Sequence, residues 1–156
     1  MMYITLLVTG KLKEAHWRKA EEEYLKRLMP YTKITIKELK EESFKNLGEK
    51  KKIMTLEAKR ITKNIPKNDT VIVLHETGKQ YTSIELAAFL KKQTTSGEHL
   101  TFIIGGPLGL DESILKSSQH QLSLSSLTFP HQMVRTILLE QIYRGVTITK
   151  GKQYHY

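Results

Sequence analysis

The end of the chain combines groups that can move a proton, stack on a base and hold a phosphate. Tyr154, His155 and Tyr156 are the last three residues, and Arg144 and Lys152 come shortly before them. Imidazole exchanges a proton near neutral pH, aromatic rings stack on nucleic-acid bases, and cations hold phosphates. Taken alone, the segment is more typical of a frayed terminus, because the last residues of most domains are poorly tied down.

A glycine-rich turn follows the apolar stretch of residues 100–104. It reads Gly105-Gly106-Pro107-Leu108-Gly109. Glycines directly after a strand let the backbone turn sharply and let a ligand approach it closely. The spacing matches neither the dinucleotide fingerprint nor the phosphate loop. By itself the turn is as consistent with a structural role as with a ligand site.

A short polar loop leads through Pro130 into a predicted helix. Its residues are Leu124, Ser125, Ser126, Leu127, Thr128 and Phe129. Hydroxyl and backbone N–H groups can read the edge of a flat heterocycle that apolar side chains enclose. Without further information a helix-capping loop is the favoured interpretation.

Several classes of site are excluded or disfavoured. The chain has no cysteine, so it has no disulfide and no thiolate chemistry, which fits a reducing cytoplasm. The six histidines are scattered without metal-ligand spacing, and we predict no metal site. No G-x-S-x-G elbow is present, which argues against a serine hydrolase.

Composition describes one basic globular domain covering residues 1–156. Lys and Arg number 25 against 16 Asp and Glu, a formal net charge of +9. This excess favours a polyanionic partner, most plausibly nucleic acid, although a solvated basic surface is equally compatible. No apolar run reaches the length needed to cross a bilayer, so no membrane association is expected. No signal peptide is recognised either, and we expect a cytoplasmic location.

Strand-like and helix-like segments alternate along the chain, which predicts an α/β fold with a mostly parallel sheet flanked by helices. Strands are expected at residues 3–8, 33–39, 70–74, 100–104 and 121–124. Helices are expected at residues 14–28, 49–65, 82–96, 111–118 and 130–144. Thr82 and Glu85 form a predicted capping box, and Gly145 is the predicted stop of the last helix.

The last predicted helix carries more apolar surface than one stripe requires. Its apolar residues are Met133, Val134, Ile137, Leu138 and Ile142. We therefore expect part of this helix to pack against a second copy in a two-fold homodimer.

Together these segments resemble one family over essentially the whole chain. The opening ITLLVTGKLKE, then VIVLHETGK, FIIGGPLGL, LSLSSLTFPHQMVRTILLEQIYR and the terminal YH are similar to the bacterial ribosomal RNA large-subunit methyltransferase H family, of the SPOUT class. The resemblance implies a SPOUT-type fold with a C-terminal deep trefoil knot, a homodimer, and S-adenosyl-L-methionine as cofactor. The implied reaction methylates N3 of a pseudouridine in helix 69 of 23S rRNA, in assembled ribosomes.

The resemblance also assigns site residues. The implied cofactor positions are Leu74, Gly105, Leu124, Ser125, Ser126, Leu127, Thr128 and Phe129. The implied substrate-side, catalytic residues are Arg144, Tyr154 and His155. One departure is visible, because His75 follows Leu74 where the family usually has an acidic residue.

The types of these residues suit the implied methyl transfer. N3 of pseudouridine must lose a proton before it attacks a methyl group, and His155 can take that proton or position the group that does. Arg144 can stabilise the negative charge that develops on the uracil carbonyls. If the tail is catalytic, we expect it to fold over the cofactor pocket, and the sequence leaves open which subunit of the dimer supplies each group. Two alternatives remain, another SPOUT methyltransferase acting on tRNA or rRNA, and a basic ribosome-assembly factor without catalysis.

Overall fold

The computed structural model describes residues 1–156 and contains five strands and five α-helices. The strands are β1 (Met2–Thr9), β2 (Thr32–Leu39), β3 (Thr70–Gln80), β4 (Leu100–Ile104) and β5 (His120–Ser123). The helices are α1 (Ala15–Leu28), α2 (Lys50–Asn64), α3 (Ser83–Thr95), α4 (Glu112–Ser117) and α5 (His131–Thr149), and a 3-10 turn η1 spans Leu47–Glu49.

All five strands form one sheet in the order β2-β1-β4-β3-β5, and every neighbouring pair is parallel. The predicted α/β class is therefore confirmed, with a sheet that is fully rather than mostly parallel. Because parallel strands share a direction, all five carboxyl ends lie at one edge of the sheet. The trefoil knot implied by the resemblance stays a prediction.

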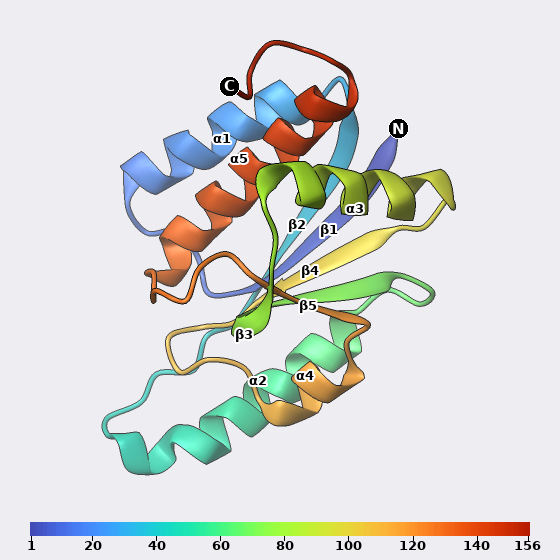
Figure 1. Ribbon diagram of the computed structural model, residues 1–156. Coiled ribbons are helices and arrows are strands. Elements are labelled where there is room, and N and C mark those ends of the chain that lie inside the picture. Colours follow the sequence, from blue (N-terminus) through green and yellow to red (C-terminus); the bar gives the residue numbers. More distant parts are fainter.

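Helices cover the two faces of the sheet (Figure 1). One face packs against α1, α3 and α5 through a cluster that includes Leu6, Phe102, Leu138 and Ile142. The other face packs against α2 and α4 through a smaller cluster around Leu7, Ile61, Ile103 and Ile114. β4 lies in the centre, and all five of its residues are buried, which explains its uninterrupted apolar sequence. No helix is both long enough and apolar enough to cross a membrane.

Local signals predicted the start of α3 correctly but the end of α5 wrongly. Thr82 and Glu85 form the predicted capping box. Gly145 does not stop α5, because it is a buried helical residue whose missing side chain lets α3 approach. A Cβ at Gly145 would lie 3.4 Å from the Cα of Ala87. The helix instead ends at Thr149. Gly151 follows with a φ of 62°, and the N–H groups of Gly151 and Lys152 donate to the carbonyls of Ile148 and Thr147, which is a Schellman-type cap.

Candidate active site

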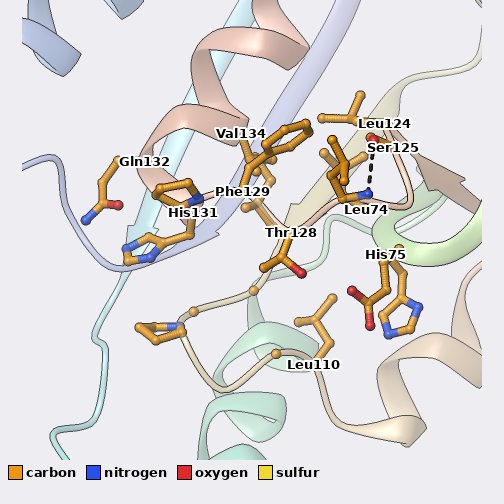
Figure 2. Close-up of a pocket in the computed structure, with 18 of the residues that line it drawn as sticks. Leu74, His75, Leu110, Leu124, Ser125, Thr128, Phe129, His131, Gln132 and Val134 are labelled. Atoms are coloured by element: carbon orange, nitrogen blue, oxygen red, sulfur yellow. Dashed lines mark hydrogen bonds between the residues drawn. The ribbon is translucent and has the colours of Figure 1, made fainter.

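A cavity of about 800 Å³ opens at the carboxyl edge of the sheet. Its walls come from the middle of β3, the turn after β4 and the loop that joins β5 to α5 (Figure 2). Ligands of open parallel sheets bind outside the carboxyl ends of the strands. The volume is also in the range of small-molecule sites, roughly 300–1,000 Å³. This cavity is therefore the candidate ligand site.

The structure gathers all but one of the predicted cofactor residues around this cavity. Those that line it are Leu74, Gly105, Leu124, Ser125, Leu127, Thr128 and Phe129. Ser126 is exposed and lies outside the lining. Figure 2 shows Leu74, Leu124 and Phe129 together on one side of the cavity, with Leu110 across from them. Apolar walls on opposite sides suit a flat ligand.

The loop between β5 and α5 keeps backbone groups free for a ligand. The hydroxyl of Ser123 donates to the carbonyl of Ser125 at 3.0 Å, and the N–H of Leu127 donates to the hydroxyl of Ser125 at 3.0 Å. The N–H groups of Ser126 and Thr128 donate to no atom of the chain. Free donors beside apolar side chains can select a heterocycle by its edge. Ser126 thus offers a free backbone N–H between two residues that line the cavity, while its side chain is not part of the lining.

The glycine turn after β4 is shaped by its own packing. The N–H of Gly109 donates to the carbonyl of Gly106 at 3.0 Å, and Gly109 has a φ of 85°, which favours glycine. A Cβ at Gly105 would lie 2.8 Å from Cγ of Leu110. A side chain at position 105 would therefore clash with Leu110, so packing within the chain already requires a glycine there.

The middle of β3 departs from regular pairing beside the cavity. Its register with β5 shifts between Leu74 and Lys79. His75 and Glu76 lie in this irregular stretch and both line the cavity. Nδ1 of His75 lies 2.7 Å from the hydroxyl of Thr77. Although His75 replaces the usual acidic residue, Glu76 still brings a carboxylate to the cavity wall.

The first turn of α5 adds residues that the sequence did not single out. His131 lines the cavity, and burial lowers the pKa of its imidazole, so the ring is neutral at neutral pH. The sequence feature that could have identified His131 is its position directly after Pro130, at a helix start beside the polar loop. Arg135, one turn later, fixes this end of α5. Its buried guanidinium binds both oxygens of Glu21 at 2.7 and 2.9 Å and Glu38 at 3.0 Å.

The three predicted catalytic residues form a second cluster, at the other end of α5. Nη1 of Arg144 lies 3.2 Å from Nδ1 of His155, and the guanidinium lies 4.7 Å from the ring centroid of Tyr154. Glu140 binds Arg144 at 2.6 Å, and this hydrogen bond raises the pKa of the guanidinium further. We call Arg144, Tyr154 and His155 the tail cluster.

Tyr154 is a docked residue rather than a frayed one. Its ring packs edge-on against Tyr143 at 4.9 Å between centroids, and its hydroxyl donates to Glu140 at 3.2 Å. Burial, with smaller contributions from Tyr24 and Glu140, raises the pKa of the phenol to about 12. Tyr154 is therefore a hydrogen-bond donor and a stacking surface at neutral pH, and cannot serve as the base.

The tail cluster does not reach the cavity of its own chain. Gln132 lines the cavity, whereas Arg144 lies twelve residues further along α5. At a rise of about 1.5 Å per residue the two are roughly 18 Å apart. The expectation that the tail folds over the pocket is therefore wrong within one chain, because Tyr154 is anchored on the distal turns of α5. Figure 1 shows the C-terminus beside α1, away from the ends of β3 and β4.

Comparisons with known proteins agree with this architecture. Three solved structures share the fold: a probable methylase family protein from Haemophilus influenzae, a putative methylase family protein from Neisseria gonorrhoeae and a probable methyltransferase from Bordetella pertussis. The Haemophilus protein has a TM-score of 0.54 at 12% identity, with 99% of this chain and 70% of that chain covered. The Neisseria protein has a TM-score of 0.54 at 13% identity, with 98% and 85% covered. The Bordetella protein has a TM-score of 0.52 at 8% identity, with 93% and 96% covered.

Sequence comparison is more specific than these fold matches. The model of a family described as predicted SPOUT methyltransferase matches residues 2–155, which is nearly the whole chain. The chain therefore belongs to the SPOUT methyltransferase family.

Proposed function

We propose that the protein transfers a methyl group from S-adenosyl-L-methionine to N3 of a pseudouridine in helix 69 of 23S rRNA, acting on assembled ribosomes. The observation that carries this proposal is the pairing of two sites in one small chain. One is a cavity walled by the residues that resemble the family's cofactor positions, and the other is the tail cluster with an imidazole beside a guanidinium.

The cavity residues fit the cofactor by chemistry. Leu74, Leu124 and Phe129 would hold the adenine between apolar surfaces, and the free N–H groups of the loop would bind its edge. The Glu76 carboxylate suits ribose hydroxyls or the cationic end of the ligand. When bound, S-adenosyl-L-methionine supplies a methyl group activated by a positive sulfonium. The side chains of the cavity need only hold the ligand in line and exclude water.

The tail cluster has the groups needed to deprotonate the nucleophile, N3 of the pseudouridine. Arg144 only donates hydrogen bonds, so in its contact with His155 the acceptor is Nδ1. When Arg144 turns to a uracil carbonyl, Nδ1 of His155 is released and can accept the proton of N3. The guanidinium then stabilises the negative charge on that carbonyl. Tyr154 keeps its proton and offers its ring or hydroxyl to position the base.

A second copy of the chain would bring the two sites together. A two-fold axis crossing the middle of α5 exchanges the two ends of this helix, so the tail cluster of one protomer would meet the cavity of its partner. Met133, Val134 and Ile137 lie in the first half of α5 and are only partly buried. They supply apolar surface for such a contact. The homodimer is thus part of the proposed function.

The proposed RNA partner follows from charge and size. The net charge of +9 favours a phosphate backbone and predicts strongly salt-dependent binding. A single domain has few elements that can read bases, so specificity should come from the assembled shape of the ribosome. Protein-free 23S rRNA should therefore be a poor substrate.

The test is methyl transfer from isotopically labelled cofactor to ribosomes that lack the modification, followed by mapping of the labelled nucleotide. The proposal expects label at N3 of the helix 69 pseudouridine. Ribosomes already methylated there are the matched control and should take up none. Label at another nucleotide, or in tRNA, would support a different SPOUT methyltransferase. Absence of transfer despite ribosome binding would support a non-catalytic assembly factor.

A further inference from the structure

One face of the sheet is not fully covered by helices. The alternating residues of β2 that face away from α1 and α5 are exposed, namely Lys33, Thr35 and Lys37. The smaller core cluster on this side contains Leu7 of β1 but none of these three residues. Parallel sheets normally bury both faces. The bare part of β2 therefore needs an explanation.

An aromatic pair borders this bare strand. Tyr3 of β1 lies opposite Lys33 in the parallel register. On its other side Tyr3 stacks on His99, with ring centroids 4.8 Å apart and planes inclined by 17°. Tyr3 is 42% exposed and His99 is also exposed. A stacked pair in solvent adds little to the core, so its packing is not explained by the fold.

Lys33 and Lys37 place two positive charges on the exposed face of β2. Glu38 of β2 turns to the other face, where it binds Arg135 at 3.0 Å. Two carboxylates at the amino edge, Asp69 and Glu98, each bind a threonine hydroxyl and keep their negative charge. Asp69 accepts a hydrogen bond from Thr101 at 2.7 Å, and Glu98 accepts one from Thr70 at 2.5 Å. Lys33 and Lys37 make no ion pair and are free for a ligand.

We propose that Tyr3, His99, Lys33 and Lys37, which we call the β2 platform, bind a single-stranded segment of RNA. A base would extend the Tyr3–His99 stack, and the two lysines would hold the flanking phosphates. Neighbouring strands lie about 4.8 Å apart, so Lys33, Tyr3 and His99 span roughly 10 Å, the scale of one nucleotide and its neighbour. Sequence-tolerant binding to single strands uses this combination of stacking surface and cations.

The position of the β2 platform separates it from the candidate active site. Tyr3 and His99 lie at the amino edge of the sheet, whereas the cavity opens at the carboxyl edge. The platform also lies on the face opposite to α5, so a dimer formed through α5 would leave it open. The inference rests on the proposed RNA substrate, and assigns the platform to RNA that flanks the methylated nucleotide.

The experiment measures binding of a fluorescent single-stranded RNA oligonucleotide by anisotropy, without cofactor, over a range of salt concentrations. The test variants are Lys33→Gln/Lys37→Gln and Tyr3→Leu, and the matched control is Lys19→Gln/Lys92→Gln, which removes two exposed charges elsewhere. We expect the Lys33→Gln/Lys37→Gln variant to lower the slope of log affinity against log salt by about 1.4, or about 0.7 per lysine. Tyr3→Leu should weaken binding on the order of tenfold, as expected for one lost base stack.

Two further arms keep the result unambiguous. His99→Ser removes the other ring and should lower the RNA affinity as much as Tyr3→Leu does. This arm keeps the test valid even if Tyr3→Leu lowers the melting temperature. A duplex of the same sequence should bind less tightly, because its bases cannot stack on the pair. The proposal would be overturned if the two lysine double variants lost the same amount of affinity for the RNA. It would also be overturned if Tyr3→Leu and His99→Ser both kept the wild-type affinity. Methyl transfer to ribosomes is scored separately, so a failed platform and a failed methyltransferase assignment give different outcomes.

Discussion

Nη1 of Arg144 and Nδ1 of His155 lie 3.2 Å apart at the distal end of α5. Because a guanidinium has no acceptor, this contact uses the lone pair of Nδ1 and leaves the ring proton on Nε2. His155 therefore cannot use Nδ1 as a base until Arg144 moves. In the proposed reaction a carbonyl of the substrate would take over Arg144 and so free Nδ1 of His155.

The first prediction concerns this pair. His155→Ala should lower single-turnover methyl transfer by about 10²- to 10⁴-fold, the range for a lost general base. The loss should shrink as pH rises, because N3 then ionises with less help. The side chain is exposed, so the melting temperature should stay unchanged. A loss that is constant with pH would assign His155 to positioning and not to proton transfer.

The second prediction concerns the titration of Tyr154. Burial raises the pKa of its phenol to about 12 from an ordinary value of 10. A raised pKa in the folded state means that its contribution to stability is complete below pH 10 and is lost as pH rises toward 12. An ultraviolet absorbance titration should show one tyrosine ionising last, and Tyr154→Phe should remove that step. Tyr143→Phe is the matched control and should keep the step.

The third prediction concerns the cofactor. Leu127 lines the cavity although its side chain is 69% exposed. Leu127→Ala should therefore cost little stability but weaken cofactor binding about tenfold, because a buried contact with the ligand is lost. Isothermal calorimetry and ligand-induced thermal stabilisation would measure this. Leu47→Ala, at a leucine that is 72% exposed and does not line the cavity, should bind the cofactor like the wild type.

The fourth prediction tests whether two chains share one site. One chain would lack residues 153–156, and the other would carry Leu127→Arg, which blocks the cavity with a cation. Each homodimer should be inactive. Heterodimers isolated with two affinity tags should recover about half the wild-type rate, because one of the two shared sites is intact. Inactive heterodimers would mean that each chain builds its site from its own residues.

Local sequence predicted most elements within one or two residues, and the reasons are local. The central strands are continuous apolar runs, and Thr82 with Glu85 is a self-contained cap. The prediction for Gly145 failed because local sequence cannot distinguish a glycine that ends a helix from one that admits a neighbouring helix. Only the packing of α3 on α5 makes that distinction, through the contact of Gly145 with Ala87.

The sequence by itself determined the α/β class, the family and the two groups of candidate site residues, because these depend on residue types, periodicity and motif spacing. It did not determine that these groups lie at opposite ends of α5, or that Glu76 and His131 join the cavity wall. Those relationships depend on strand order and on the anchoring of Tyr154 against Tyr143 and Glu140. Both arise from contacts between residues distant in sequence, which only the tertiary structure brings together.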